Sequence, residues 1–260
     1  MVAGDEQWHG MRVKRAIVVI TGVVLIAWGG YYGARLWPLV VASPTAGERV
    51  VLLHGLGRNA RAMLLLESAL TDAGYEVHNI GYPSKSLPPE ALIGRVADEV
   101  SACCAADDQL THFVGHSLGG LLIRGYLAEQ RPARLGRVVQ LGSPNAGSEV
   151  ADVDLEGELD TFVREYVGPA GRALTTAADG FPASLPPPDY PLGVIAGTRC
   201  NPLTDQWLPS PNDGLVSLAS ASATEVTEIW TVDASHWQLR NRQDVAERVV
   251  AFLRTGTFSD

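Results

Sequence analysis

A serine between two glycines is the feature of this chain with the clearest chemical meaning. The segment Gly115-His116-Ser117-Leu118-Gly119 has the Gly-x-Ser-x-Gly pattern of a nucleophile elbow, which places a serine on a strained turn between a strand and a helix. Glycines two positions to either side let the strand and the helix pass closely. Because a chance match is not rare in a chain with 27 glycines, the neighbouring sequence must decide.

The residues around Ser117 supply the strand and the helix that the pattern needs. Leu110 to Val114 is a short, largely apolar run rich in strand formers, and Leu118 to Gln130 carries apolar residues at helical spacing. We therefore predict Ser117 as a nucleophile exposed above a sheet. A serine hydroxyl is a poor nucleophile at neutral pH, so it needs a base, a group that orients the base, and donors for the oxyanion.

A histidine and an aspartate later in the chain complete that machinery. Of the six histidines, only His236 lies well beyond Ser117, on the loop after the last predicted strand, and we predict it as the base. Asp205, Asp213 and Asp233 are candidates for the orienting carboxylate. We predict Asp213, with Asp205 as second choice, because an Asn-Asp-Gly turn can point its carboxylate inward.

Two backbone amides are the expected oxyanion donors. One belongs to Leu118, the residue after the nucleophile. The other should come from the loop after the first strand, where the glycines of His54-Gly55-Leu56-Gly57-Arg58 permit close backbone approach, and we predict the amide of Leu56. His54 is expected to be a structural hydrogen-bonding residue rather than a base.

Strand-like and helix-like segments alternate along the body of the chain, which predicts an α/β fold with a mostly parallel sheet flanked by helices on both faces. The expected strands are Val50 to Leu53, Glu76 to Ile80, Thr111 to Val114, Arg137 to Leu141, Leu192 to Ala196 and Glu228 to Val232. The expected helices are Ala60 to Ala73, Pro89 to Ala102, Leu118 to Gln130 and Gln243 to Arg254.

One connection in this domain, which we place at residues 50–260, is too long to be a plain loop. Between the strands ending at Leu141 and beginning at Leu192 the chain carries alternating acids, a helical stretch, and then Pro182, Pro186, Pro187 and Pro188. We expect residues of about 145–190 to form a small cap over the carboxyl edge of the sheet, where open α/β folds bind ligands. The alternative is a surface excursion with a solvated acidic face.

The sequence of the amino terminus predicts a membrane anchor. Ala16 to Ala34 holds no charged residue, follows Arg12, Lys14 and Arg15, and has aromatic residues towards its far end. We expect residues 1–35 to form a cytoplasmic tail and a single transmembrane signal anchor, followed by a linker at 36–49. The chain would then sit in a bacterial inner membrane with its catalytic domain on the extracytoplasmic side. A cleaved signal peptide, giving a secreted protein, is the alternative.

Charge and cysteine content narrow the possible partners. A net charge of −9 argues against nucleic-acid binding, which needs a basic face. Since neither a phosphate-binding glycine loop nor a zinc-type spacing is present, we expect no cofactor and no metal. A bridge from Cys103 or Cys104 to Cys200 is conceivable, but we expect buried free thiols.

Four motifs together resemble the α/β-hydrolase superfamily, and within it bacterial lipases and esterases. They are His54-Gly55-Leu56-Gly57, the elbow at Ser117, Asn212-Asp213-Gly214 and Ser235-His236. Similar runs in lipase-like hydrolases match Gly81-Tyr82-Pro83-Ser84 and residues 141–148. The resemblance implies an eight-stranded sheet, often with one antiparallel edge strand.

These observations predict a serine hydrolase that cleaves carboxylic esters of small molecules or lipids through an acyl-serine intermediate. Because fold and triad do not fix the acyl acceptor, an acyltransferase, an amidase or a thioesterase with the same acyl-enzyme stays open. A hydrolase-like binding module without catalysis is the third alternative.

Overall fold

Short apolar segments form a parallel sheet in the computed structural model, which describes residues 47–104, 109–154 and 157–259. Its six strands lie in the order β2-β1-β3-β4-β5-β6, and every neighbouring pair is parallel. The bounds are β1 Glu48–Leu53, β2 Glu76–Ile80, β3 Leu110–His116, β4 Leu135–Leu141, β5 Leu192–Gly197 and β6 Glu228–Val232.

All six predicted strands are therefore present, and β2 and β6 have the predicted bounds. The eight strands and the antiparallel edge strand implied by the resemblance are not found, since the described residues supply six parallel strands only. The four inner strands are mostly buried and form largely apolar runs, which made them recognisable in the sequence. The edge strands β2 and β6 are only partly buried and contain more polar residues.

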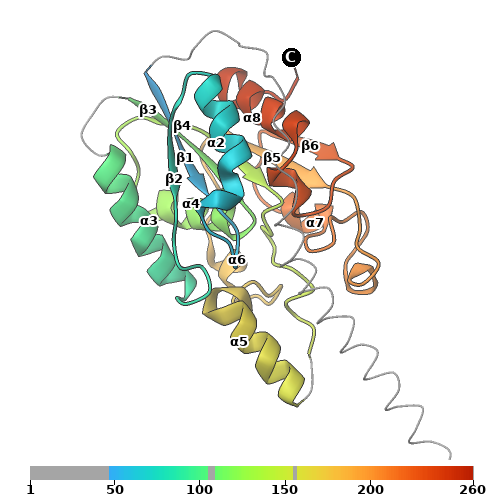
Figure 1. Ribbon diagram of the computed structural model, residues 1–260. Coiled ribbons are helices and arrows are strands. Elements are labelled where there is room, and N and C mark those ends of the chain that lie inside the picture. Colours follow the sequence, from blue (N-terminus) through green and yellow to red (C-terminus); the bar gives the residue numbers. More distant parts are fainter. Residues whose placement is uncertain (1–46, 105–108, 155–156, 260) are drawn as a thin grey trace, which may run out of the picture.

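Helices cover both faces of the sheet, as predicted (Figure 1). Side chains alternate along β1: Val51 and Leu53 pack with α3 and α4, whereas Val50 and Leu52 pack with α2 and α8. The helices are α2 Leu64–Asp72, α3 Pro89–Cys104, α4 Leu118–Glu129, α5 Glu158–Arg172, α6 Phe181–Ser184, α7 Leu218–Ala221 and α8 Gln243–Thr255, with 3₁₀ turns η1 Ala60–Met63, η2 Asp205–Trp207 and η3 Gln238–Arg240.

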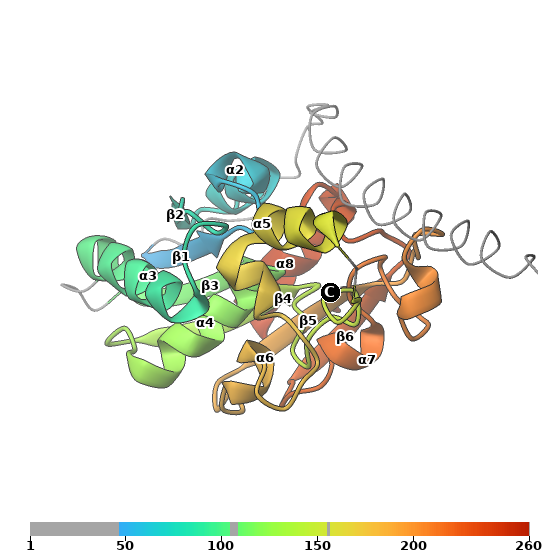
Figure 2. The ribbon, with the colours of Figure 1, turned by 90° about the horizontal axis from the view of Figure 1, so that it is seen from below.

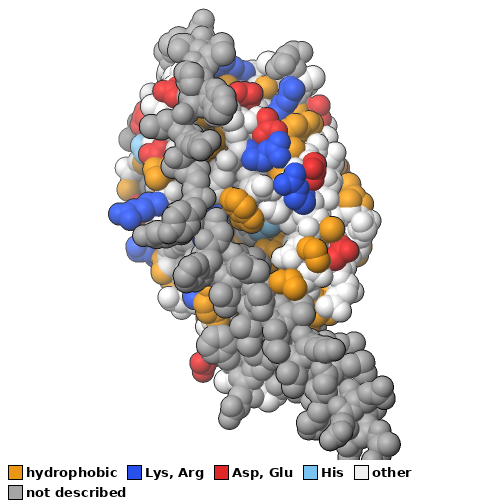
Figure 3. Space-filling view, turned by 45° about the vertical axis from the view of Figure 1, so that its right-hand side comes forward, with side chains coloured by type: hydrophobic (Ala, Val, Ile, Leu, Met, Phe, Trp, Pro, Cys, Tyr) orange, Lys and Arg blue, Asp and Glu red, His pale blue; other side chains and the backbone are white. Residues whose placement is uncertain are grey.

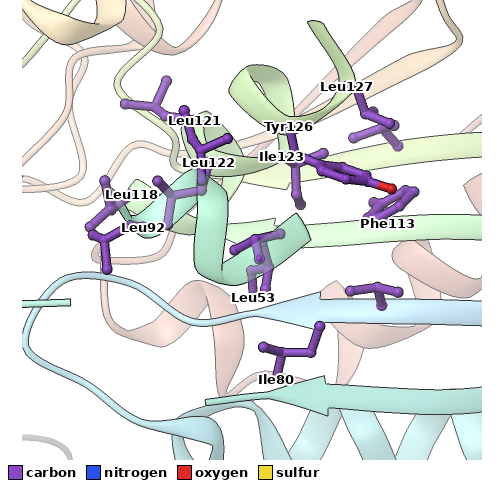
Figure 4. Packing of buried hydrophobic residues seen from close by; sticks show 14 of the residues in the cluster. Leu53, Ile80, Leu92, Phe113, Leu118, Leu121, Leu122, Ile123, Tyr126 and Leu127 are labelled. Atoms are coloured by element: carbon purple, nitrogen blue, oxygen red, sulfur yellow. The ribbon is translucent and has the colours of Figure 1, made fainter. Parts of the chain in front are cut away.

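The α4 helix, which begins directly after Ser117, is buried along most of its length. Figure 4 shows its Leu121, Leu122 and Tyr126 in the same cluster as Leu53 of β1 and Phe113 of β3. The close packing of these apolar side chains fixes the helix against the strands on either side of the elbow. The position of Ser117 is thus determined by the core.

The connection between β4 and β5 holds α5 and α6. In Figure 1 these helices lie beyond one end of the sheet, and in Figure 2, seen from that side, α5 lies in front of the strands. Gly168 has a non-helical conformation within α5 and is followed by Pro169, so the helix is kinked there. The segment occupies the place expected for the cap, at the edge where the loops after the strands meet.

The cysteines differ from the expectation of buried free thiols. Cys103 and Cys104, at the end of α3, form a disulfide between adjacent residues. Cys200 is free and exposed. The expectation was wrong because spacing along the chain says little about which sulfur atoms meet in space.

Within the described ranges, every helix is too short or too polar to cross a bilayer. The predicted tail and anchor, residues 1–35, lie outside the described residues, as does the predicted linker up to residue 46. At the end of that linker, Glu48 and Arg49 belong to β1 instead.

Candidate active site

Ser117 stands at a strained turn between β3 and α4. Its φ is 56°, and it is the non-glycine residue with positive φ in the described part of the chain. Residues other than glycine rarely adopt a positive φ. The conformation costs about 1–3 kcal/mol and persists only where the surrounding structure enforces it. A strained serine at the junction of a strand and a helix is the geometry that the Gly-x-Ser-x-Gly pattern predicts.

The two flanking glycines are required by close backbone contacts. A Cβ on Gly115 would lie 2.4 Å from the backbone nitrogen of Gly120, and a Cβ on Gly119 would lie 2.3 Å from the carbonyl oxygen of Leu53. Both distances are far inside van der Waals contact, and backbone atoms cannot move aside as a flexible side chain can. The glycines therefore let α4 pass against β1 and β3, as the sequence indicated.

Asp213 and His236 form a buried pair. The Nδ1 of His236 is 2.7 Å from Oδ2 of Asp213, and both residues are buried. The other carboxylate oxygen, Oδ1, accepts hydrogen bonds from the backbone nitrogens of Leu215 and Val216, at 3.0 and 2.8 Å. With Nδ1 donating to the carboxylate, Nε2 is the free nitrogen, so the imidazole can accept a proton there.

The two competing aspartates have other partners. Asp205 is exposed and accepts a hydrogen bond from the side-chain amide of Asn212 at 2.9 Å. Asp233 is exposed and pairs with Arg199 at 2.8 Å. Among the three candidates, Asp213 is therefore the one in contact with His236.

Ser117 and His236 line the same pocket, and each is 8% exposed. In the described part of the chain the Ser117 hydroxyl makes no hydrogen bond to the imidazole. Hydrogen bonds of this kind are often long in free enzymes and tighten when substrate binds. The structure thus joins His236 and Asp213 by a hydrogen bond, and places Ser117 at the same cavity as His236.

The backbone amides of Leu56 and Leu118 have no hydrogen-bond acceptor among the described residues. Leu118 is the first residue of α4, so its N–H has no partner within the helix. Both are therefore available as oxyanion donors, which is the role we predict for them.

The loop that carries Leu56 is held by buried side chains. The ring of Tyr82 stacks on His54 at 4.1 Å, its hydroxyl donates to the His54 carbonyl, and its backbone N–H donates to Nε2 of His54 at 3.3 Å. Burial lowers the pKa of His54, so the ring stays neutral. Ser84 accepts a hydrogen bond from the Gly57 amide at 2.9 Å. The motif Gly81-Tyr82-Pro83-Ser84 is thus the support of this loop, and His54 is structural as expected.

His116 supports the loop that carries His236, a role that sequence analysis did not predict. Its Nε2 donates to the carbonyl oxygen of His236 at 3.0 Å, while its Nδ1 is buried without a partner. Burial, together with the positive charge that His236 can carry, holds the pKa of His116 well below its ordinary value. The hydrogen bond of a neutral His116 therefore connects the loop that carries His236 to the turn that carries Ser117.

The pocket above Ser117 has a volume of about 520 Å³, which is within the range of sites for small organic ligands. Its wall is mainly apolar and comes largely from the connection between β4 and β5. Four cationic side chains also line it. Sequence analysis noted only Arg58, as part of the glycine loop, because the position of the others at the pocket depends on tertiary contacts. The apolar residues include Leu56, Val150, Val153, Val163, Val167, Leu174, Leu215 and Val216, and the cations are Arg58, Lys85, Arg172 and Arg240.

Comparison with protein families gives a match over residues 49–168 to the model described as palmitoyl protein thioesterase. A triacylglycerol lipase of Burkholderia plantarii is 29% identical over 185 residues, which cover 63% of this chain and 51% of the lipase. The carbamate hydrolase RutD of Variovorax paradoxus is 34% identical over 117 residues, or 42% of this chain and 44% of that protein. The chain spans about half the length of these relatives.

Solved structures extend the likeness of the fold over most of the chain. The mature form of a Bacillus licheniformis lipase gives a TM-score of 0.60 at 19% identity and covers 84% of this chain and 96% of that one. A lipase-esterase related protein of Clostridium acetobutylicum gives a TM-score of 0.53 at 17% identity over 82% and 97% of the two chains. At these identities the likeness establishes the fold alone.

Proposed function

We propose that the chain is a serine hydrolase of the α/β-hydrolase superfamily, and that it cleaves carboxylic esters through an acyl-Ser117 intermediate. The observation that carries the proposal is the buried hydrogen bond between Asp213 and His236 in the pocket that holds the strained Ser117. A nucleophile, a base and an orienting carboxylate in this order are the parts that acyl transfer needs.

The reaction begins when Oγ of Ser117 attacks the ester carbonyl carbon and His236 accepts the hydroxyl proton at Nε2. The amides of Leu56 and Leu118 donate to the oxyanion. As the C–O bond to the alcohol breaks, His236 returns the proton to the leaving oxygen. Water then attacks the acyl carbon, gives its proton to His236, and the acid leaves as Ser117 regains that proton. Asp213 holds the imidazole and stabilises its charged form without taking the proton.

The apolar wall supports an acyl chain as the group bound beside Ser117. Val150, Val153 and Leu174 of the connection between β4 and β5, together with Leu215, offer hydrocarbon surface at the pocket. Transfer of a methylene group from water to such a surface contributes roughly 0.8 kcal/mol. The proposed substrate is therefore an ester of a fatty acid rather than of a small polar acid.

Thioester cleavage is the second candidate, because the matched palmitoyl protein thioesterase model covers the segment with the oxyanion loop and Ser117. Ethyl octanoate and S-ethyl thiooctanoate differ by one atom and separate the two activities. A higher kcat/KM for the oxygen ester supports the esterase, and a strong preference for the thioester makes the chain a thioesterase. Dominant ester formation with added alcohol would instead identify an acyltransferase.

Labelling of the full chain with a fluorophosphonate probe tests the nucleophile. We expect wild type to be labelled and Ser117→Ala to be unlabelled, while Ser143→Ala serves as a control that keeps the label. Equal labelling of wild type and Ser117→Ala would show the assignment to be wrong. Nitrophenyl esters from acetyl to palmitoyl then give the chain-length preference, and a preference for acetyl would exclude long acyl chains.

We also propose that Ala16 to Ala34 anchors the chain in a bacterial inner membrane, with the catalytic domain on the extracytoplasmic side. The uncharged run and the preceding basic residues support this orientation. A protease added to intact spheroplasts should digest the domain, and the chain should stay in the membrane fraction after a high-salt wash. Recovery of a shortened chain in the soluble periplasmic fraction would indicate a cleaved signal instead.

A further inference from the structure

Arg240 is a buried cation in the wall of the candidate active-site pocket. It ends η3, four residues after His236, and is 2% exposed. Its Nη1 donates to the carbonyl oxygen of Trp237 at 2.9 Å, but its Nε is buried without a partner. In the described part of the chain, no carboxylate lies within salt-bridge distance of this guanidinium. A buried charge without an opposite charge is costly unless a ligand compensates it.

Other arginines near this edge of the molecule do have carboxylate partners. Arg199 pairs with Asp233, and Arg242 pairs with Asp244, and all four side chains are more exposed than Arg240. Figure 3 shows such neighbouring basic and acidic side chains on one face of the molecule. An exposed arginine needs a carboxylate partner least, because water already solvates its charge. Arg240 shows the opposite: it is buried, lines a pocket, and has no carboxylate partner among the described residues.

A second positive charge lies close to Arg240. Arg58 is half-buried, lines the same pocket, and follows Leu56 of the oxyanion loop by two residues. Burial and the charge of Arg58 together lower the pKa of Arg240 to about 10. Lys85 lines the pocket too, with its ammonium group 4.0 Å from the ring centre of Tyr166. Cations thus gather on one part of the pocket wall.

This cationic part lies near the atoms that react. Both arginines act on His116, the residue before Ser117, since their charges help to lower its pKa. Arg58 stands beside one predicted oxyanion donor and Arg240 follows the base. An anion held by these guanidinium groups would therefore be a neighbour of the carbonyl under attack, and not a remote surface ligand.

Arg58 and Arg240 come from segments other than the one that supplies most of the apolar residues, although that connection also places Arg172, Asp152 and Asp154 at the pocket. Apolar side chains come largely from the connection between β4 and β5, whereas Arg58 and Arg240 come from the loop after β1 and from η3. If the acyl chain takes the apolar part, the alcohol or thiol portion of the substrate meets the cations. Arginine binds phosphate and carboxylate with two parallel hydrogen bonds, so both anions suit the site.

We propose that the substrate carries an anionic group, a phosphate or a carboxylate, on its alcohol or thiol portion, and that Arg240 and Arg58 bind this group beside the reacting carbonyl. The inference rests on the proposed function, because it assigns the substrate class of the same site. It makes Arg58 and Arg240 determinants of specificity for the leaving group.

Two hexanoyl esters of nearly equal size test the charge preference: 4-(hexanoyloxy)benzoate is anionic and 4-(hexanoyloxy)benzamide is neutral. The readout is the ratio of their kcat/KM values, after correction for their rates of spontaneous hydrolysis. We expect wild type to favour the anionic ester by about tenfold, which corresponds to ~1.4 kcal/mol. Arg58→Gln and Arg240→Gln should each bring the ratio towards one. Arg61→Gln, which removes an exposed charge outside the pocket, should keep it.

Arg240→Lys keeps a charge at the buried position, and should retain more of the ratio than Arg240→Gln if both fold. Wild type alone gives an independent check, because added salt should lower kcat/KM for the anionic ester and leave the neutral ester nearly unchanged. A wild-type ratio of one, or a ratio that survives both glutamine substitutions, would overturn the proposal.

A second pair of substrates places the charge on the acyl side: mono-4-nitrophenyl adipate against 4-nitrophenyl hexanoate. An anion preference in this pair, in place of the benzoate pair, would contradict the assignment to the leaving group. The proposed function fails separately, since it requires fluorophosphonate labelling and hydrolysis of the neutral esters. Hydrolysis of the neutral esters without any charge preference would overturn the present inference alone.

Discussion

The loops that carry Ser117, Asp213 and His236 differ in construction from the connection between β4 and β5 that closes the other side of the pocket. The three residues are buried, and backbone hydrogen bonds hold their loops in place. The amide of Ser117 donates to Leu141 at the end of β4, at 2.9 Å, and the amide of His236 donates to Asp213 at 2.8 Å. Many residues of the connection are half-buried or exposed, and α5 is interrupted at Gly168.

The difference in construction corresponds to two functions, which are positioning of the reacting groups and binding of the hydrocarbon part of the substrate. A reacting constellation must be held to within a fraction of an ångström, which buried backbone bonds and close packing achieve. A wall that receives hydrocarbon chains needs only apolar surface and tolerates small movements. We therefore expect substitutions at the loops to affect turnover, and substitutions in the connection to affect which acyl chain is accepted.

The strongest test of the loop side is Asp213→Asn. The asparagine can still accept from the amides of Leu215 and Val216, but it no longer supports the charged imidazole or fixes its tautomer, so kcat should fall by about 10⁴. Steady-state hydrolysis of a nitrophenyl ester measures the change. Asp233→Asn, at an exposed surface pair, should stay within about twofold. A larger loss at position 233 than at 213 would mean that the carboxylate is misassigned.

Gly119→Ala tests the packing beneath the loops. Its Cβ would lie 2.3 Å from the Leu53 carbonyl oxygen, so the helix must move away from β1, and we expect a loss of about 3 kcal/mol in the free energy of unfolding. Urea denaturation measures it. Gly94→Ala is the matched control on α3, where nothing lies within 4 Å, and it should be neutral or stabilise by about 0.5–1 kcal/mol. Similar effects at both positions would contradict the close contact.

Val153→Trp tests the connection side. The larger ring fills part of the apolar wall without contacting the triad, so the ratio of kcat/KM for dodecanoyl and acetyl esters should fall by about tenfold. Chain-length profiles of wild type and variant provide the measurement. An equal loss on both esters would show that the connection also positions the reacting groups, and the contrast between the two sides would then be wrong.

The pH dependence of stability gives the smallest effect. Burial lowers the pKa values of His54, His112 and His116, so these residues stay neutral in the folded chain when the unfolded chain binds protons. Stability should therefore be lost as the pH falls below about 6.5, by up to about 1.4 kcal/mol per pH unit for each histidine. His116→Gln should remove about 1 kcal/mol of this loss between pH 7 and 5.5, as followed by urea denaturation at both pH values.

Gly94→Ala is the control for this measurement, because it removes no titratable group and its Cβ meets nothing within 4 Å. We expect this substitution to leave the slope of stability against pH unchanged. A slope that is the same in wild type and in His116→Gln would contradict a neutral, buried His116.

Much of the fold could be predicted because its signals are local. Each buried parallel strand is a short apolar run, and the Asn-Asp-Gly turn distinguished Asp213 from Asp205 before any contact was known. The positions of Ser117 and His236 followed from the order of motifs. Their catalytic roles, and the oxyanion roles of Leu56 and Leu118, stay predictions that the variants above test.

The remaining features depend on contacts between distant segments, which a single sequence does not record. Arg240 looks like an ordinary surface arginine in the sequence, and its burial depends on tertiary contacts of η3, which packs against β5 and α8. The disulfide between Cys103 and Cys104 was likewise missed, as was the support that Tyr82 gives to His54. None of these follows from periodicity or from a turn signal.

The contact between Gly119 and Leu53 has a further consequence for how this site can change over time. Because bare backbone meets bare backbone there, the separation between the loop after β1 and the start of α4 depends on no side chain. Neighbouring apolar residues can then be exchanged for others of similar volume while the backbone amides of Leu56 and Leu118 keep their spacing. Related proteins could in this way lose most of their sequence identity around the elbow and still keep the same backbone distance between the loop after β1 and the start of α4.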